Sequence, residues 1–151
     1  PPNASPQEIS HHHQALDQQL DKGYGSCLLR DHAKIILDAW RYFEDQHYQI
    51  VVAVVMPNHV HILIILNGTR ELPQIIHSWK SYTAHEILKK LPLAQQEELN
   101  HHLWQEDYWD RFIRDEKHFF KTIDYILQNP VKAGLVNKAE EWPWAIFPNK
   151  D

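Results

Sequence analysis

The sequence predicts an α+β fold, with helices packed on an antiparallel sheet, and three observations carry this prediction. Two β-branched runs, residues 49–56 and 59–66, are separated only by the turn residues Pro57 and Asn58, as in a β-hairpin. Amphipathic helical patterns precede and follow this hairpin. The chain has 151 residues, of which 43% are hydrophobic and 23% charged, as expected for one globular domain. The order of elements implies a sheet with its helices on one face.

Residues 1–22 show no convincing core pattern, so we expect them to form a peripheral, partly helical segment. They contain three consecutive histidines, His11 to His13, and many glutamines. Successive side chains diverge on any regular backbone, so we interpret this run as solvated rather than as a metal chelate. The predicted domain then covers residues 23–147, and residues 148–151 form a tail.

Local patterns predict the other elements in turn. A helix is expected over residues 30–46 with Asp31 as its N-cap, because apolar residues recur there at helical spacing. After the hairpin, a long helix is expected from about Leu72 to the breaker Pro92. The remaining expected elements are a short polar helix over 94–103, a strand over 108–115, and a helix over 115–129 that ends at Pro130.

Composition and charge exclude several classes of protein. The net charge is -5, so the overall field does not attract a polyanion and any nucleic-acid contact must rest on local groups. The longest apolar run, residues 50–56, is far shorter than the roughly 20 residues that span a bilayer, and the polar start lacks a signal-peptide pattern. The single cysteine, Cys27, excludes an internal disulfide and a cysteine-rich zinc site. We therefore expect a soluble protein that is not exported.

Two histidines in the second hairpin strand form the first candidate site. His59 and His61 are two residues apart, so their side chains point to the same face, with Cα atoms roughly 6.6 Å apart. Burying histidines on so apolar a strand costs free energy unless their nitrogens form hydrogen bonds or bind a metal. The spacing alone is compatible with a metal-binding pair and with a hydrogen-bonded pair beside the turn.

The last predicted helix carries a second candidate. Tyr125 and Asn129 are four residues apart and share a helix face, which places a potential nucleophile beside an oxygen ligand. Taken alone, the pair has a simpler interpretation. Tyr125 is then a core residue of an amphipathic helix, and Asn129 with Pro130 is a helix stop.

The two candidates and their surroundings together resemble a known family. The motifs VVMPNHVHILI, SWKSYTAHEI, WQEDYWDRFIRDEKHF, TIDYILQNPVKAGLV and EEWPW occur in this order between about Gly23 and Trp144. This set is similar to the REP-associated tyrosine transposases, within the HUH single-tyrosine transposase superfamily. A histidine pair alone would be a weak signal, whereas several separated motifs in order are specific.

The resemblance implies a role for each candidate residue. His59 and His61 fall on the family's metal-binding pair, Tyr125 on its nucleophile and Asn129 on a further metal ligand, with Mg²⁺ or Mn²⁺ as the cofactor. The implied fold is a ferredoxin-like sandwich. The family's opening strand is not evident in this sequence. Either the chain is truncated, or residues 26–29 or the N-terminal tail take that strand's place.

The activity implied by the resemblance is cleavage and strand transfer of single-stranded DNA at hairpin-forming repeats through a 5′-phosphotyrosine. The implied partner is single-stranded or hairpin DNA, bound by a monomer or homodimer at a cytoplasmic, nucleoid-associated location with no membrane. A non-cleaving or domesticated module that binds structured single-stranded DNA is the alternative. A metal-dependent hydrolase that uses water is a more distant one.

Several other residues compete for or extend these roles. Tyr82 and Tyr108 are competing nucleophiles, but neither has a comparable partner four residues on. Gln128 is the alternative to Asn129 as an oxygen ligand. The candidate DNA-binding cations are Lys80, Arg111, Arg114, Lys121 and Lys132. The candidate base-stacking tryptophans are Trp79, Trp104 and Trp109.

Overall fold

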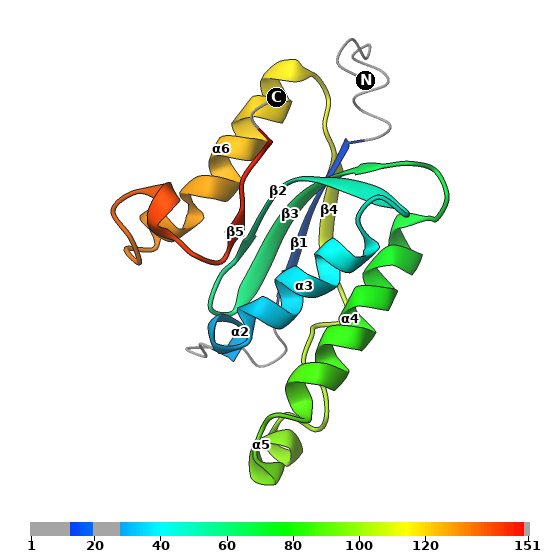
Figure 1. Cartoon of the computed structure of the whole chain (residues 1–151), viewed down its shortest axis with the longest axis vertical. Coiled ribbons are helices and arrows are strands. Elements are labelled where there is room, and N and C mark those ends of the chain that lie inside the picture. Colours follow the sequence, from blue (N-terminus) through cyan, green and yellow to red (C-terminus); the bar gives the residue numbers. More distant parts are fainter. Residues whose placement is uncertain (1–12, 20–27, 150–151) are drawn as a thin grey trace.

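A computed structural model describes residues 13–19 and 28–149 (Figure 1). The strands are β1 (His13–Gln19), β2 (Tyr48–Val55), β3 (His59–Leu66), β4 (Trp109–Phe112) and β5 (Ala145–Ile146). The helices are α2 (Leu28–Asp31), α3 (Ala33–Phe43), α4 (Leu72–Leu88), α5 (Leu93–Glu98), α6 (Glu116–Lys132) and the 3-10 turn η1 (Ala139–Glu141).

The five strands form one antiparallel sheet in the order β4-β1-β3-β2-β5. Helix α3 connects β1 to β2, and α4 with α5 connects β3 to β4, so the first four strands have ferredoxin-like topology. The predicted hairpin is present, and the backbone N–H of Met56 donates to the carbonyl of His59 across its turn, with an N···O distance of 2.8 Å. The α+β prediction is confirmed.

Strand β1 corrects the prediction of a peripheral N-terminal segment. Residues 13–19 lie between β3 and β4, and the exposed fraction of Leu16 is only 2%. The strand escaped prediction because Gln14 and Gln18 are also buried. The amide of Gln14 donates to Asp110 at 2.5 Å, and that of Gln18 to the carbonyl of Gln105 at 2.8 Å. The N-terminal tail therefore supplies the strand that the motifs lacked; residues 1–12 and 20–27 lie outside the described residues.

The sheet is covered on both faces, which corrects the expectation of helices on one face only (Figure 1). Helices α3 and α4 pack on one face, where Trp40 and Trp79 meet edge to face with ring centroids 5.8 Å apart. Helix α6 packs on the other face, where Ile126 contacts a second core that includes Val54 and Leu63. A strand covered on both faces reads as a continuous apolar run, as residues 59–66 do apart from the two histidines.

Several helix boundaries differ from the prediction: α3, α4 and α5 end earlier than expected, at Phe43, Leu88 and Glu98, and the start of α3 and the end of α6 also move. Helix α3 begins at Ala33 with His32 as its N-cap, because Asp31 already belongs to the short helix α2. Helix α6 runs through Pro130 instead of ending there. Pro130 lies in the last turn, where its missing N–H costs one hydrogen bond, and Gly134 then ends the helix with a φ of 74°.

Helix α4 extends beyond the sheet, and α5 lies at its far end (Figure 1). The N-terminus of α4 has a reciprocal capping box, in which the side chains of Glu71 and Gln74 each accept a hydrogen bond from the other residue's backbone N–H. Within the described part of the chain, no helix is both long enough and apolar enough to cross a membrane.

The central position of β1 predicts a large stability cost for Leu16→Ala. Removing a side chain that is 98% buried should lower the free energy of unfolding by about 2–5 kcal/mol. Leu93→Ala is the matched control, because Leu93 is 66% exposed and its loss should change stability by less than about 0.5 kcal/mol. Chemical denaturation measures both. Equal effects of the two substitutions would show that Leu16 is not buried, and therefore that residues 13–19 are peripheral.

Candidate active site

The histidine pair lies near the centre of the sheet, on the face that α6 covers. His59 and His61 point to the same face of β3, with ring centroids 4.8 Å apart and ring planes at 88°. His61 is buried, with 5% of its surface exposed, whereas His59 is half-buried. The predicted convergence of two imidazoles on one spot is therefore present.

Asp17 on the neighbouring strand holds one ring nitrogen of His61. The two residues are direct cross-strand partners in the β1–β3 register, and the Nδ1–H of His61 donates to Oδ1 of Asp17. The other nitrogen, Nε2, is buried and has no hydrogen-bond partner among the described residues. A buried nitrogen without a partner is costly, and a carboxylate behind the opposite nitrogen is the usual support of a metal-binding histidine. The support that a metal-binding histidine requires is thus present at His61.

His59 is kept in its neutral form. Burial lowers its pKa to about 4, and the charge of His61 acts in the same direction, while Asp17 and a hydrogen bond with Asn129 oppose the shift. Its Nδ1 lies 2.7 Å from Oδ1 of Asn58 at the hairpin turn. An imidazole with so low a pKa has a lone pair available near neutral pH, as a metal ligand requires.

Helix α6 brings Tyr125 and Asn129 to the histidine pair. The ring centroid of Tyr125 is 5.8 Å from that of His61, and 43% of the tyrosine surface remains exposed. The side-chain amide of Asn129 donates to the backbone carbonyl of Tyr125 at 3.0 Å. A hydrogen bond with Asn129 raises the pKa of His59, as expected when the amide oxygen accepts from the imidazole N–H. Lys132, one turn further, places Nζ 5.2 Å from the centre of the Tyr125 ring.

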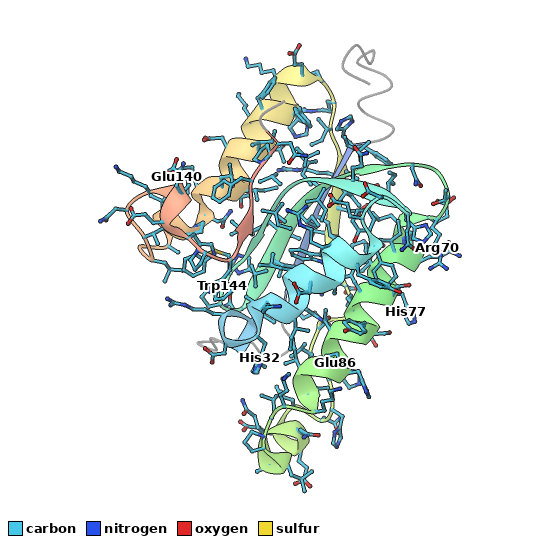
Figure 2. All side chains as sticks on the ribbon, in the orientation of Figure 1. His32, Arg70, His77, Glu86, Glu140 and Trp144 are labelled. Atoms are coloured by element: carbon cyan, nitrogen blue, oxygen red, sulfur yellow. The ribbon has the colours of Figure 1, made fainter. Side chains whose placement is uncertain are left out.

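The donors present fit a divalent cation. His59, His61 and Asn129 offer two imidazole nitrogens and an amide oxygen, a mixed set compatible with Mn²⁺ or Mg²⁺ when water completes the sphere. Across residues 13–19 and 28–149 there is no group of three or more His, Cys, Asp or Glu side chains placed to hold a metal. Two other histidines, His32 and His77, lie with α3 and α4, across the sheet from α6, and so are not part of this site (Figure 2). The amide oxygen of Asn129 is therefore the third donor that this site offers.

The competing tyrosines lie elsewhere. Tyr82 is 51% exposed on α4 and lines a groove with Tyr42 of α3, on the opposite face of the sheet from the histidines. Tyr108 packs against the core beneath α3 and α4, where burial and Asp110 raise its pKa. Of these three tyrosines, Tyr125 is the one in contact with the histidine pair.

Among the candidate DNA-binding cations, one is hydrogen-bonded within the protein and three others are exposed. Nζ of Lys80 donates to the carbonyl of Gln105 at 2.7 Å, so this cation fastens the loop before β4. Arg111, Arg114 and Lys121 are exposed on β4, on the segment after it, and on α6. Gln128 is half-buried on α6.

The three candidate tryptophans also differ in exposure. Trp79 and Trp104 are core residues with 2% and 5% of their surface exposed, and their ring centroids lie 5.3 Å apart. Trp109 is 76% exposed on the edge strand β4. Among these three, only Trp109 could stack on a DNA base without unfolding the core.

Asp17 is the site residue that the sequence did not reveal. Its role depends on pairing with His61, which is 44 residues further along the chain. The stretch around it, HQALDQQ, lacks the β-branched residues that predict a strand. The one available signal was the family's missing opening strand, which pointed to the tail without identifying a residue.

The fold and the site together define a ferredoxin-like protein with a histidine pair and a tyrosine on facing elements. The chain belongs to the family described as Transposase IS200 like, which matches residues 26–129. It is 28% identical over 114 residues to a Haemophilus influenzae protein assigned to the REP-associated tyrosine transposases, covering 68% of this chain and 61% of that protein. It is 29% identical over 104 residues to the Escherichia coli REP-associated tyrosine transposase, covering 68% and 56%.

The chain therefore spans about three fifths of the length of these two relatives. A solved structure of a REP-associated tyrosine transposase bound to a REP hairpin has the same fold. Its TM-score with this chain is 0.74 at 24% identity, over 91% of this chain and 77% of that one. The family resemblance predicted from the motifs is confirmed.

The Asp17–His61 contact predicts a specific proton signal. A buried Nδ1–H held by a carboxylate should give a far-downfield, slowly exchanging imidazole resonance in the proton NMR spectrum. Asp17→Ala should abolish this resonance, whereas Asp38→Ala should leave it unchanged, because Asp38 pairs with Lys34 on the surface. If the resonance persists in Asp17→Ala, a different group holds His61.

Proposed function

We propose that this chain is a metal-dependent single-stranded DNA endonuclease and strand transferase that works through a 5′-phosphotyrosine. The observation that carries the proposal is the contact of Tyr125 with His61, whose buried Nε2 has no hydrogen-bond partner in the described part of the chain. Membership of the IS200-like transposase family supports it. The REP hairpin held by the structural neighbour supports hairpin-forming repeats as the substrate class.

His59, His61 and Asn129 would hold the cation, Mg²⁺ or Mn²⁺. When bound, the cation would supply Lewis-acid stabilisation of the charge that develops on the phosphate oxygens. His59 is neutral near pH 7, since its pKa is about 4, and the amide of Asn129 does not ionise. Neutral donors leave the cation's charge available to an anionic phosphodiester.

Tyr125 would attack phosphorus through its phenolic oxygen. The bond from phosphorus to the tyrosine oxygen forms as the bond to the 3′ oxygen breaks. The phenol loses its proton and the departing 3′ oxygen gains one. The product is a 5′-phosphotyrosine and a free 3′-hydroxyl, and a second 3′-hydroxyl can reverse the step without ATP. With 43% of its surface exposed, Tyr125 is accessible to a DNA strand.

Two further residues would support this step. Lys132 lies beside the Tyr125 ring, where its positive charge would face the incoming phosphate. Asp17 would fix the orientation of His61 through Nδ1. The site is formed between a helix and a sheet, so we expect unpaired DNA or the foot of a hairpin to enter it and a paired duplex to be excluded.

The nucleophile is tested by Tyr125→Phe. The protein is incubated with a labelled single-stranded hairpin and Mn²⁺, and denaturing gel electrophoresis detects a covalent adduct. Tyr125→Phe removes only the attacking oxygen, so the adduct should fall below detection while DNA binding persists. Tyr82→Phe is the control and should form the adduct normally. Undiminished adduct in Tyr125→Phe would refute the assignment, and binding without adduct in the unmodified protein would favour the non-cleaving module.

The third ligand is tested by a neighbouring pair of substitutions. Asn129→Ala should raise the Mn²⁺ concentration needed for half-maximal adduct formation by about tenfold or more. Substituting residues that only support metal ligands already weakens metal binding by about tenfold. Gln128→Ala, on the same helix and also half-buried, should leave that concentration nearly unchanged. The reverse ranking would show that the site is built on Gln128.

A further inference from the structure

We propose that a groove between β1 and β4 is a subsite for one unpaired base of the DNA, with Trp109 as the stacking platform. The groove has a volume of about 280 Å³ and is lined by Ala15, Asp17, Trp109, Asp110 and Arg111. This inference rests on the proposed function for its ligand, single-stranded DNA, but not on cleavage.

Strand register joins the groove to the active site. Asp17 of β1 is the direct partner of His61 on one side and of Trp109 on the other. Direct cross-strand partners share a face, so Trp109, Asp17 and His61 form a row across three strands on the face that α6 covers. Strand spacing places the Cα of Trp109 roughly 10 Å from that of His61, a distance that neighbouring nucleotides of one strand can span.

Trp109 is unlike the other tryptophans of the chain. Trp40, Trp79, Trp104 and Trp142 have exposed fractions between 0% and 5%, and Trp144 is half-buried. Trp109 is 76% exposed, although an indole on a sheet edge is an aggregation risk. Its surface contributes little to either core, which leaves it available to a ligand.

The groove's chemistry fits a base with its phosphate. Both carboxylates in its lining already accept hydrogen bonds, Asp17 from His61 and Asp110 from the side-chain amide of Gln14 at 2.5 Å. Arg111, two residues from Trp109 on the same face, is an exposed cation within reach of a phosphate or a base plane. With a volume of about 280 Å³, the groove has room for a single base.

Intrinsic fluorescence tests the subsite directly. The full chain carrying Tyr125→Phe is titrated, without divalent metal, with a single-stranded deoxyadenosine oligonucleotide, an abasic strand of equal length, and the matching duplex. The deoxyadenosine strand should quench the exposed indole emission, whereas the abasic strand and the duplex should not. Trp109→Ala should remove this quenching and weaken binding of the deoxyadenosine strand about tenfold. Trp109→Phe, which keeps an aromatic face, should restore most of the affinity.

Phe112→Ala is the matched control. Phe112 lies on the same edge strand and is 54% exposed, but it pairs with Gln14 and so points to the opposite face. Its loss should leave affinity unchanged. Normal binding by Trp109→Ala, an equal loss in Phe112→Ala, or equal quenching by duplex would each overturn the subsite. Failure of the proposed function has a different signature, because it leaves these titrations unchanged and removes the covalent adduct from the unmodified protein.

Discussion

The pairing of Asp17 with His61 across strands β1 and β3 is the interaction on which the site depends. It satisfies one nitrogen of a histidine that is 95% buried and leaves the other, Nε2, buried with no hydrogen-bond partner among the described residues. The same register places Trp109 in line with both residues. A slip of one residue between β1 and β3 would move Asp17 to the opposite face, so the register of the sheet fixes the geometry of the site.

Burial on both faces of the sheet explains why the site lies where it does. Helices α3 and α4 stabilise one face through an apolar core, and α6 covers the other face while bringing Tyr125 and Asn129 to the histidines. The half-buried position of His59 lowers its pKa and keeps it neutral, so the layer that stabilises the fold also keeps this proposed ligand uncharged. Only part of Tyr125 is covered, which leaves the proposed nucleophile accessible from the surface.

The sequence predicted those elements whose signals are local. The hairpin, α4 and α6 have continuous patterns, and the spacing of His59 with His61 and of Tyr125 with Asn129 is preserved by regular strand and helix geometry. Strand β1 and Asp17 were missed because their burial depends on partners far along the chain, such as Asp110, which is 96 positions from Gln14. The extension of α6 through Pro130 was missed because a proline in the last turn removes only one helical bond.

Peptide mapping of the adduct shows whether Tyr125 is the residue that becomes covalently linked to DNA. Trypsin digestion of the adduct formed with a hairpin strand and Mn²⁺, followed by mass spectrometry, separates the tyrosines, because Tyr125 falls on peptide 122–132 and Tyr82 on peptide 81–89. We expect a nucleotide mass on peptide 122–132, localised to Tyr125. A nucleotide mass on peptide 81–89, or cleaved DNA with no modified peptide, would contradict it.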